Sequence, residues 1–272
     1  MFEINMLGAA NNGNVEEVTR HIDGGIHVDS KNTKGETALH IACRRDDIEL
    51  AKVLLGRNAN VNSTSNDHDS PLHELTKNDN KELAELLIKH GADINIRDKM
   101  GWTPLHEACQ EGHAEFVMLL LRNGAKINAQ DCKGFTALHI VCGKLLDNGC
   151  LTVLLSHGPD ITIVNKRGET ALELSFLFAG IDIERNMFSH CSTARMDNGR
   201  LFLHHILEDG LYSWSPGKNQ IGVKDFVKEN QKAMEDIDPK TGLYPFELAA
   251  AKNSDLDSSF ELLRRVPYLL GP

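Results

Sequence analysis

Residues 91–124 of this 272-residue chain read GADINIRDKMGWTPLHEACQEGHAEFVMLLLRNG and contain one complete structural unit. The Thr103 hydroxyl can cap the free amide groups that open a helix, and Pro104 suits the first helical position. A short helix is therefore expected after Thr103, and Ala114 to Leu121 has the apolar spacing of a second one. The second helix is expected to end at Gly124, because glycine tolerates the left-handed conformation found at helix ends.

The same unit recurs along the chain with a constant period. Its opening signature appears at Thr37-Ala-Leu-His40, Ser70-Pro-Leu-His73, Thr103-Pro-Leu-His106, Thr136-Ala-Leu-His139 and Thr170-Ala-Leu-Glu173, with successive spacings of 33, 33, 33 and 34 residues. One apolar column keeps the same register, at Leu54, Leu87, Leu120 and Leu154. One helix pair of this length cannot bury its apolar face alone, so the units must stack and share a core. The sequence therefore predicts an all-α solenoid of stacked helix-turn-helix units with short β-hairpin loops.

The opening signature, the segment Gly91-Ala-Asp-Ile-Asn95 and the 33-residue period together resemble the ankyrin repeat family over residues 32–173. The resemblance implies a non-enzymatic scaffold or adaptor that binds another protein. In such an array the hairpin tips and the concave helix face are left free for recognition, because the folding of the stack dictates the turn, cap and core positions.

Both ends of the chain depart from this pattern. Residues 1–196 are predicted to form the array, with an N-terminal capping repeat followed by about five regular repeats. Residues 197–272 are predicted to be divergent repeats continuous with the array, and the signatures that begin at Gly199 and Gly242 are 43 residues apart. A loop insertion near 212–219 would account for that spacing. The alternative is that 197–272 carries a separate effector or enzymatic activity, for which the array is a targeting module.

Composition and charge limit the possible partners and the location. The net charge of -10 argues against nucleic acid as a partner, which would favour a basic face. No apolar run reaches the roughly 18 residues of a membrane span, so no membrane insertion is expected. Cys43, Cys109 and Cys142 share one repeat column, as small core residues do in a reducing compartment, which favours the cytoplasm or the nucleus. We expect a monomer, with self-association through the open ends of the stack as the alternative.

Recurring histidines raise the question of a metal site. His40, His73, His106 and His139 share a column, but stacked helices lie about 8–10 Å apart, whereas zinc lies about 2 Å from its nitrogen ligands. One ion cannot bridge the column, and these histidines are expected to cap helices instead. No signature of a nucleophilic or phosphate-binding site occurs, and the thiol of Cys132 has no nearby base. We therefore expect no enzyme activity, no cofactor and no metal.

Recognition is expected at one patch of the array. Met100, Trp102 and Phe135 form its predicted centre, since large apolar side chains are enriched in interface cores and both rings occupy one column at the hairpin tips. The charged and polar rim is predicted to be Lys99, Gln110, Glu111, Lys133, Arg44, Arg45 and Asp69. The alternative is that either ring folds back onto a neighbouring hairpin and that the charges are merely solvated.

Asparagines also recur in the hairpins. Asn62, Asn95 and Asn128 fall in a column that, in ankyrin repeats of animal proteins, resembles the target of an asparaginyl hydroxylase. The preferred interpretation is structural, with each amide group satisfying backbone atoms of the hairpins.

Overall fold

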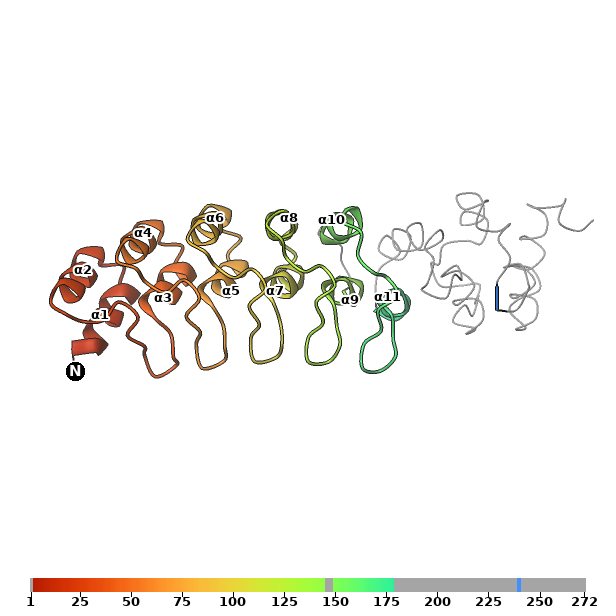
Figure 1. Ribbon diagram of the computed structural model, residues 1–272, viewed down its shortest axis with the longest axis horizontal. Coiled ribbons are helices and arrows are strands. Elements are labelled where there is room, and N and C mark those ends of the chain that lie inside the picture. Colours follow the sequence, from red (N-terminus) through yellow and green to blue (C-terminus); the bar gives the residue numbers. More distant parts are fainter. Residues whose placement is uncertain (1, 145–148, 179–238, 241–272) are drawn as a thin grey trace, which may run out of the picture. The chain divides into compact units, whose positions relative to one another are not determined.

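The computed structural model describes residues 2–144, 149–178 and 239–240, and these contain eleven helices (Figure 1). The helices are α1 (Phe2–Asn11), α2 (Val15–Asp23), α3 (Ala38–Arg44), α4 (Ile48–Gly56), α5 (Pro71–Thr76), α6 (Lys81–Lys89), α7 (Pro104–Glu111), α8 (Ala114–Arg122), α9 (Ala137–Cys142), α10 (Cys150–Ser156) and α11 (Ala171–Phe178). The chain divides into two units, of which the first includes described residues up to 141 and 149–159. The predicted boundary after residue 196, the insertion near 212–219 and the divergent repeats fall outside the described residues, apart from 239–240.

Within the first unit, consecutive helix pairs stand side by side (Figure 1). Each pair contributes its first helix to the row next to the hairpins, which we call the inner row, and its second helix to the row farther from the hairpins, which we call the outer row. In the inner row α3 packs against α1 and α5, and α5 packs against α7. In the outer row α2 packs against α4, and α8 packs against α10. The all-α stack predicted from the repeat period is confirmed.

The inner helices begin at a cap that also joins neighbouring repeats. The backbone N–H of Thr37 donates to Nδ1 of His40 at 3.1 Å, so Nε2 of that ring carries the proton and donates to the carbonyl of Asp69 at 3.0 Å. The same pair of bonds recurs at His73 and at His106, whose Nε2 atoms reach the carbonyls of Trp102 and Phe135. The predicted capping role is confirmed, and the structure adds a bond to the next repeat.

The outer helices begin and end as the sequence indicates. Side chains of Asp47 and Asn80 accept bonds from the amides of Leu50 and Leu83, which caps α4 and α6. The turn after α8 contains Gly124 with a φ of 92°, and the turn after α4 contains Asn58 with a φ of 60°. Both are in the left-handed region that glycine and asparagine tolerate.

The hairpins are closed by turns. Oδ1 of Asp131 accepts bonds from the amides of Lys133 and Phe135, and the amide of Asp131 donates to the carbonyl of Phe135. Among the described residues the one β-bridge joins Val164 and Thr170, so the predicted β-hairpins are turn-closed loops without strands. Each loop is too short to extend a ladder beyond the bonds that close it.

Backbone bonds also tie each hairpin tip to the next. The amide of Asn66 donates to the carbonyl of Lys34 at 2.8 Å, that of Lys99 donates to Asp67 at 2.9 Å, and that of Cys132 donates to Met100 at 2.9 Å. The tips of four consecutive hairpins therefore form one hydrogen-bonded row.

Asparagine side chains join the repeats at the other end of the hairpins. Nδ2 of Asn95 donates to the carbonyl of Gly124 at 3.2 Å, and its Oδ1 accepts from the amide of Lys126 at 2.7 Å. Asn62 makes the same two bonds one repeat earlier. The structural interpretation of this column is confirmed for both residues, and the bonded backbone atoms belong to the following repeat.

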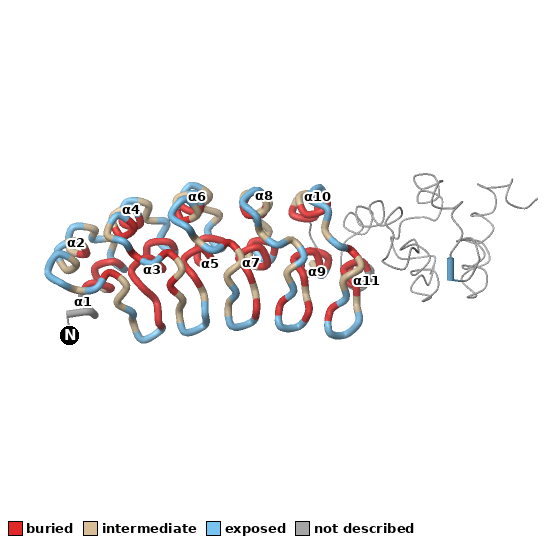
Figure 2. Tube along the Cα trace, in the orientation of Figure 1, coloured by how far each residue is buried: buried red, intermediate tan, exposed pale blue. Residues whose placement is uncertain are grey.

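The core follows the faces of the helices that meet one another, whereas the hairpin tips are exposed (Figure 2). The predicted leucine column of the first unit is fully buried, at Leu54, Leu87, Leu120 and Leu154. Cys43 and Cys109 are buried as expected, and Cys132 is exposed. Within the described part of the chain, no helix has the length and apolar character needed to cross a bilayer.

Candidate functional site

The predicted centre of the patch lies on the hairpin before α7. Met100 is 50% exposed at its tip, which makes it one of two large apolar side chains exposed among the described residues, with Val164. Lys99 beside it is exposed and forms an ion pair with Asp67 of the preceding tip at 3.7 Å. This tip therefore presents an apolar and a cationic side chain side by side.

The two aromatic rings are placed differently from the prediction. Trp102 and Phe135 are half-buried on the legs of their hairpins that lead into the helices, and they do not lie at the solvent-facing tips. Nε1 of Trp102 donates to Oδ2 of Asp131 at 3.0 Å, so this ring folds back onto the next hairpin, which was the alternative left open. Each ring also contacts the capping histidine of its own helix. Both residues keep part of their surface exposed.

The predicted rim residues fall into two groups. Lys133 is exposed at the next hairpin tip, and Gln110 and Glu111 are exposed at the end of α7. The two arginines are engaged within the chain, since Nη1 of Arg45 donates to the carbonyl of Asn11 at 2.6 Å and Arg44 lies in an ion-pair network. The structure therefore brings Lys99, Met100, Trp102 and Lys133 together through the tip row and leaves Arg45 at the N-terminal repeat.

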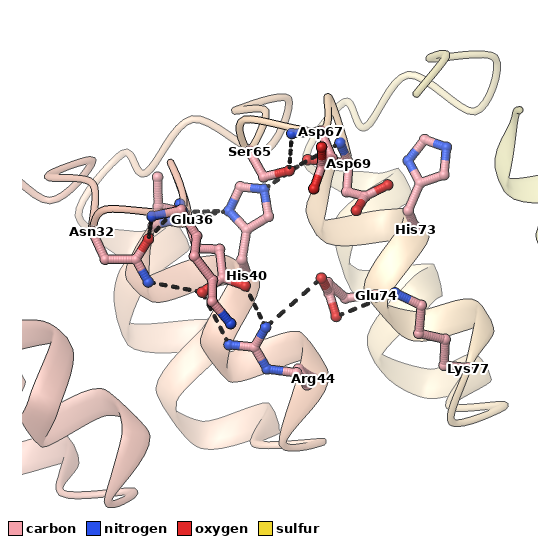
Figure 3. Close-up of polar contacts among 12 residues, drawn as sticks. Asn32, Glu36, His40, Arg44, Ser65, Asp67, Asp69, His73, Glu74 and Lys77 are labelled. Atoms are coloured by element: carbon pink, nitrogen blue, oxygen red, sulfur yellow. Dashed lines mark hydrogen bonds and ion pairs between the residues drawn. The ribbon is translucent and has the colours of Figure 1, made fainter. Parts of the chain in front are cut away.

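The ion-pair network of Arg44 joins two repeats (Figure 3). Its guanidinium lies 2.5 Å from Glu36 and 3.9 Å from Glu74, and Lys77 lies 3.8 Å from Glu74 on the other side. The hydrogen bond from Arg44 holds the pKa of Glu36 below its ordinary value. Burial raises the pKa of Glu74, although Lys77 and Arg44 oppose that shift. Two repeats thus share cations that balance two buried carboxylates, those of Glu36 and Glu74.

A cluster of three carboxylates lies one repeat further on. Asp69, Asp98 and Glu107 are each partly buried, and one oxygen of each lies within 4.8 Å of the others. Oγ1 of Thr76 donates to Oε2 of Glu107 at 3.0 Å. Burial raises the pKa of Glu107 to about 7, and burial also raises the pKa of Asp69. We call these three residues the carboxylate pocket.

Sequence reasoning included Asp69 in the rim but missed Asp98 and Glu107. Oδ1 of Asp98 accepts from the amide of Trp102 at 2.6 Å, within the hairpin before α7. A signal for Glu107 was present, because its column alternates between Ile41 and Ile140 at the outer repeats and Glu74 and Glu107 at the two central ones, so that charge replaces an apolar residue in both.

The site offers groups that bind rather than groups that react. The carboxylate pocket is the group of described residues whose ligand atoms lie close enough together to hold a cation jointly. The rings of His40, His73 and His106 are engaged at both nitrogens, and burial lowers their pKa values, that of His73 to about 4. They therefore cannot act as a base toward a bound molecule without breaking the caps.

The comparisons with known proteins agree with the repeat period. The family model for ankyrin repeats (3 copies) matches residues 6–98, 49–131 and 96–165. The chain is also 40% identical over 53 residues to the acyl-CoA-binding domain-containing protein 2 of Arabidopsis thaliana. That match covers 20% of this chain and 15% of the relative, so the two share one to two repeat lengths.

Proposed function

Because this chain belongs to the ankyrin repeat family, whose repeats are protein-interaction modules, we propose that it is a non-enzymatic scaffold or adaptor that binds a partner protein through its hairpin tips and concave helix face. The centre of the proposed contact is Lys99, Met100 and Lys133 at the hairpin tips together with Trp102 and Phe135 on the adjoining legs, and we call these five residues the tip surface.

The observation that carries the proposal is the exposed Met100 on a hairpin that is held on both sides. Its carbonyl accepts from Cys132, and the amide of Lys99 donates to Asp67, so the tip is fixed before any partner binds. A fixed surface loses little conformational entropy on binding. Large apolar side chains flanked by polar ones are the usual anchors of protein interfaces.

We further propose that the protein works as a monomer in a reducing compartment, either the cytoplasm or the nucleus. The support is the cysteine content, because four of the five described cysteines are buried in the core, as small apolar side chains are. Proteins in oxidising compartments tend to pair their cysteines.

The test is quantitative affinity capture from the native source, with the full chain as bait. The variants Met100→Ala and Trp102→Ala, alone and combined, are compared with Val164→Ala, which removes an apolar side chain of similar exposure (46%) from another hairpin. We expect the double variant to lose the captured partner by at least about tenfold, because central apolar anchors contribute about 2 kcal/mol or more. The Val164 variant should retain it.

Each variant is checked for folding, since Trp102 is half-buried and its loss also removes the bond to Asp131. If the folded double variant captures the partner as well as the wild-type chain does, the tip surface is not the binding site.

A further inference from the structure

Thr76 at the end of α5 departs from the repeat pattern. Its column holds Cys43 and Cys109 in the neighbouring repeats, so a hydroxyl replaces a thiol in the core. Thr76 is fully buried, and a buried hydroxyl must find its hydrogen-bond partners within the protein. One of these partners is Glu107, which stands where Ile41 stands two repeats earlier.

Oγ1 of Thr76 lies within hydrogen-bond distance of two oxygen atoms. The carbonyl of His73 is 2.7 Å away within α5, and Oε2 of Glu107 is 3.0 Å away on α7. A hydroxyl has one proton to donate, so it can serve only one of these oxygens when Glu107 is charged. When Glu107 is protonated, its carboxyl group donates to Oγ1 while the hydroxyl donates to His73. Both contacts are therefore satisfied at once by a neutral Glu107.

His113 ties the start of α8 to the same threonine. It stands at the register position of Asp47 and Asn80, which cap α4 and α6, but its Nδ1 lies 2.7 Å from the carbonyl of Thr76. A carbonyl oxygen only accepts, so Nδ1 carries a proton and donates. Two side chains of one repeat thus hold Thr76 of the preceding repeat. We call Thr76, Glu107 and His113 the Thr76 joint.

The surroundings of Glu107 favour its neutral form. One oxygen each of Asp69 and Asp98 lies within 4.8 Å of a Glu107 oxygen, and like charges at this separation repel. Burial raises the pKa of Glu107 to about 7, with the help of Asp69 and Asp98, although Lys77 and the bond from Thr76 oppose the shift. The hydrogen-bond geometry and the neighbouring charges thus agree.

Other ionisable groups surround the joint. From the elements packed against α7 and from α7 itself they are Lys77, Glu74 and His73 of α5 and its end, Asp69 before α5, Asp98 before α7, His106 and Glu111 on α7, and His113 before α8. Glu115 on α8 is exposed and pairs with Lys81 at 3.9 Å. Burial lowers the pKa of His73 to about 4 and also lowers that of His106, so neither ring becomes charged near neutral pH.

Glu74 occupies the same column one repeat earlier and is compensated differently. Arg44 lies 3.9 Å from its carboxylate and Lys77 lies 3.8 Å from it. Opposite charges at such distances favour the charged form of a carboxyl group. Glu74 is therefore the matched control for Glu107 within the same chain.

We infer that the Thr76 joint is controlled by one proton, which holds α7 against α5 while it resides on Glu107 and loosens α7 when it passes to water above neutral pH. The carboxylate left behind is repelled by Asp69 and Asp98 and requires water, which can reach it only if α7 moves away from α5. The bond from His113 persists, because Nδ1 can carry its proton in the neutral and in the charged ring. The inference does not depend on the proposed function.

The proton itself is measured on the full chain by carbon-13 NMR of the Glu107 carboxyl group, titrated from about pH 4 to about pH 9. The signal is assigned by its absence from the spectrum of Glu107→Gln. We expect a titration midpoint of about 7. A midpoint below about 6 would overturn the inference, because Glu107 would then be charged throughout the neutral range.

The loosening is measured by hydrogen–deuterium exchange at pH 6 and pH 8, corrected for the intrinsic pH dependence of exchange. Because the carboxyl group has a pKa of about 7 in the closed joint and 4.5 in water, the protection of α7 should fall about tenfold between these pH values. The protection of α4, which lies in an earlier repeat, should change less than about twofold. Constant protection of α7 in the wild-type chain would contradict the switch.

Two variants assign the pH dependence to one carboxyl group. Glu107→Gln should protect α7 equally at both pH values, since its amide group can donate to Thr76 and does not titrate. Glu74→Gln should retain the wild-type fall. If α7 loses protection to the same extent in Glu107→Gln as in the wild-type chain, the proton is not on Glu107.

A third variant tests the hydroxyl. Thr76→Cys restores the residue that this column holds in the neighbouring repeats, so it is expected to fold. Because a thiol is a weak hydrogen-bond partner, the protection of α7 at pH 6 should fall about fivefold. If this variant protects α7 at pH 6 as well as the wild-type chain does, the hydroxyl does not hold the proton of Glu107 and the inference is wrong.

Discussion

At the scale of single residues, Glu107 makes the stability of the array depend on pH. Its pKa of about 7 lies above the ordinary value of 4.5 because burial disfavours the charged form. The folded state therefore binds this proton more tightly than the unfolded state. The resulting stability is fully present below pH 4.5 and is lost as the pH rises through 7.

Glu107→Gln should consequently stabilise the array at pH 8 and much less at pH 5. The amide keeps an acceptor for Thr76 and removes the buried charge, so we expect a gain of about 1 to 2 kcal/mol at pH 8. Urea unfolding at both pH values measures the difference. If Glu107→Gln is less stable than the wild-type chain at pH 8, other groups of the folded protein stabilise the charged carboxylate of Glu107.

The capping histidines give the opposite pH dependence. The pKa of His73 is lowered to about 4 by burial, and those of His40 and His106 are lowered for the same reason. Their contribution to stability is fully present above the ordinary value of 6.5 and is lost as the pH falls through the folded-state pKa. Glutamine cannot be protonated in this pH range, so His73→Gln should lose less of its neutral-pH stability on acidification than the wild-type chain does. We therefore expect its acid unfolding transition to lie at lower pH once its neutral-pH stability is taken into account. A pH titration followed by circular dichroism would check this. An unchanged acid transition would show that protonation of His73 does not contribute to acid unfolding.

At the scale of elements, the side-chain bonds between hairpins couple one repeat to the next. Asn95→Ala removes a donor and an acceptor that both serve the following repeat, and it should cost about 1 to 3 kcal/mol. Asn95→Asp keeps the acceptor and should lose part of that amount. Asn123→Ala is the control, since its amide bonds only within its own helix. Thermal unfolding of the three variants ranks them, and equal stabilities would contradict the coupling.

The helices could be predicted from the sequence because their caps are local. Thr103 and His106 are three residues apart, and Gly124 follows its helix directly, so one stretch of chain contains each signal. The site could be predicted only in part. The position of the Trp102 ring depends on Asp131, which is 29 residues away, and the carboxylate pocket combines three elements. No local pattern in the sequence reports such contacts.

At the scale of the whole molecule, each described repeat of the first unit is held in place by its neighbours. The inner row, the tip row and the asparagine bonds all hold the hairpins in register along the first unit. The charges that fold the array are shared between repeats, as the ion pairs of Arg44 with Glu36 and Glu74 show.

Hydrogen–deuterium exchange on the complex with the captured partner would show whether the partner binds at the hairpin tips and the concave face. We predict that the partner slows exchange in residues 98–111, which include the Met100 tip and α7, and leaves the outer helices α6 and α8 unchanged. Protection confined to α6 and α8, with 98–111 exchanging as in the free chain, would contradict the claim that the hairpin tips and the concave face bind the partner.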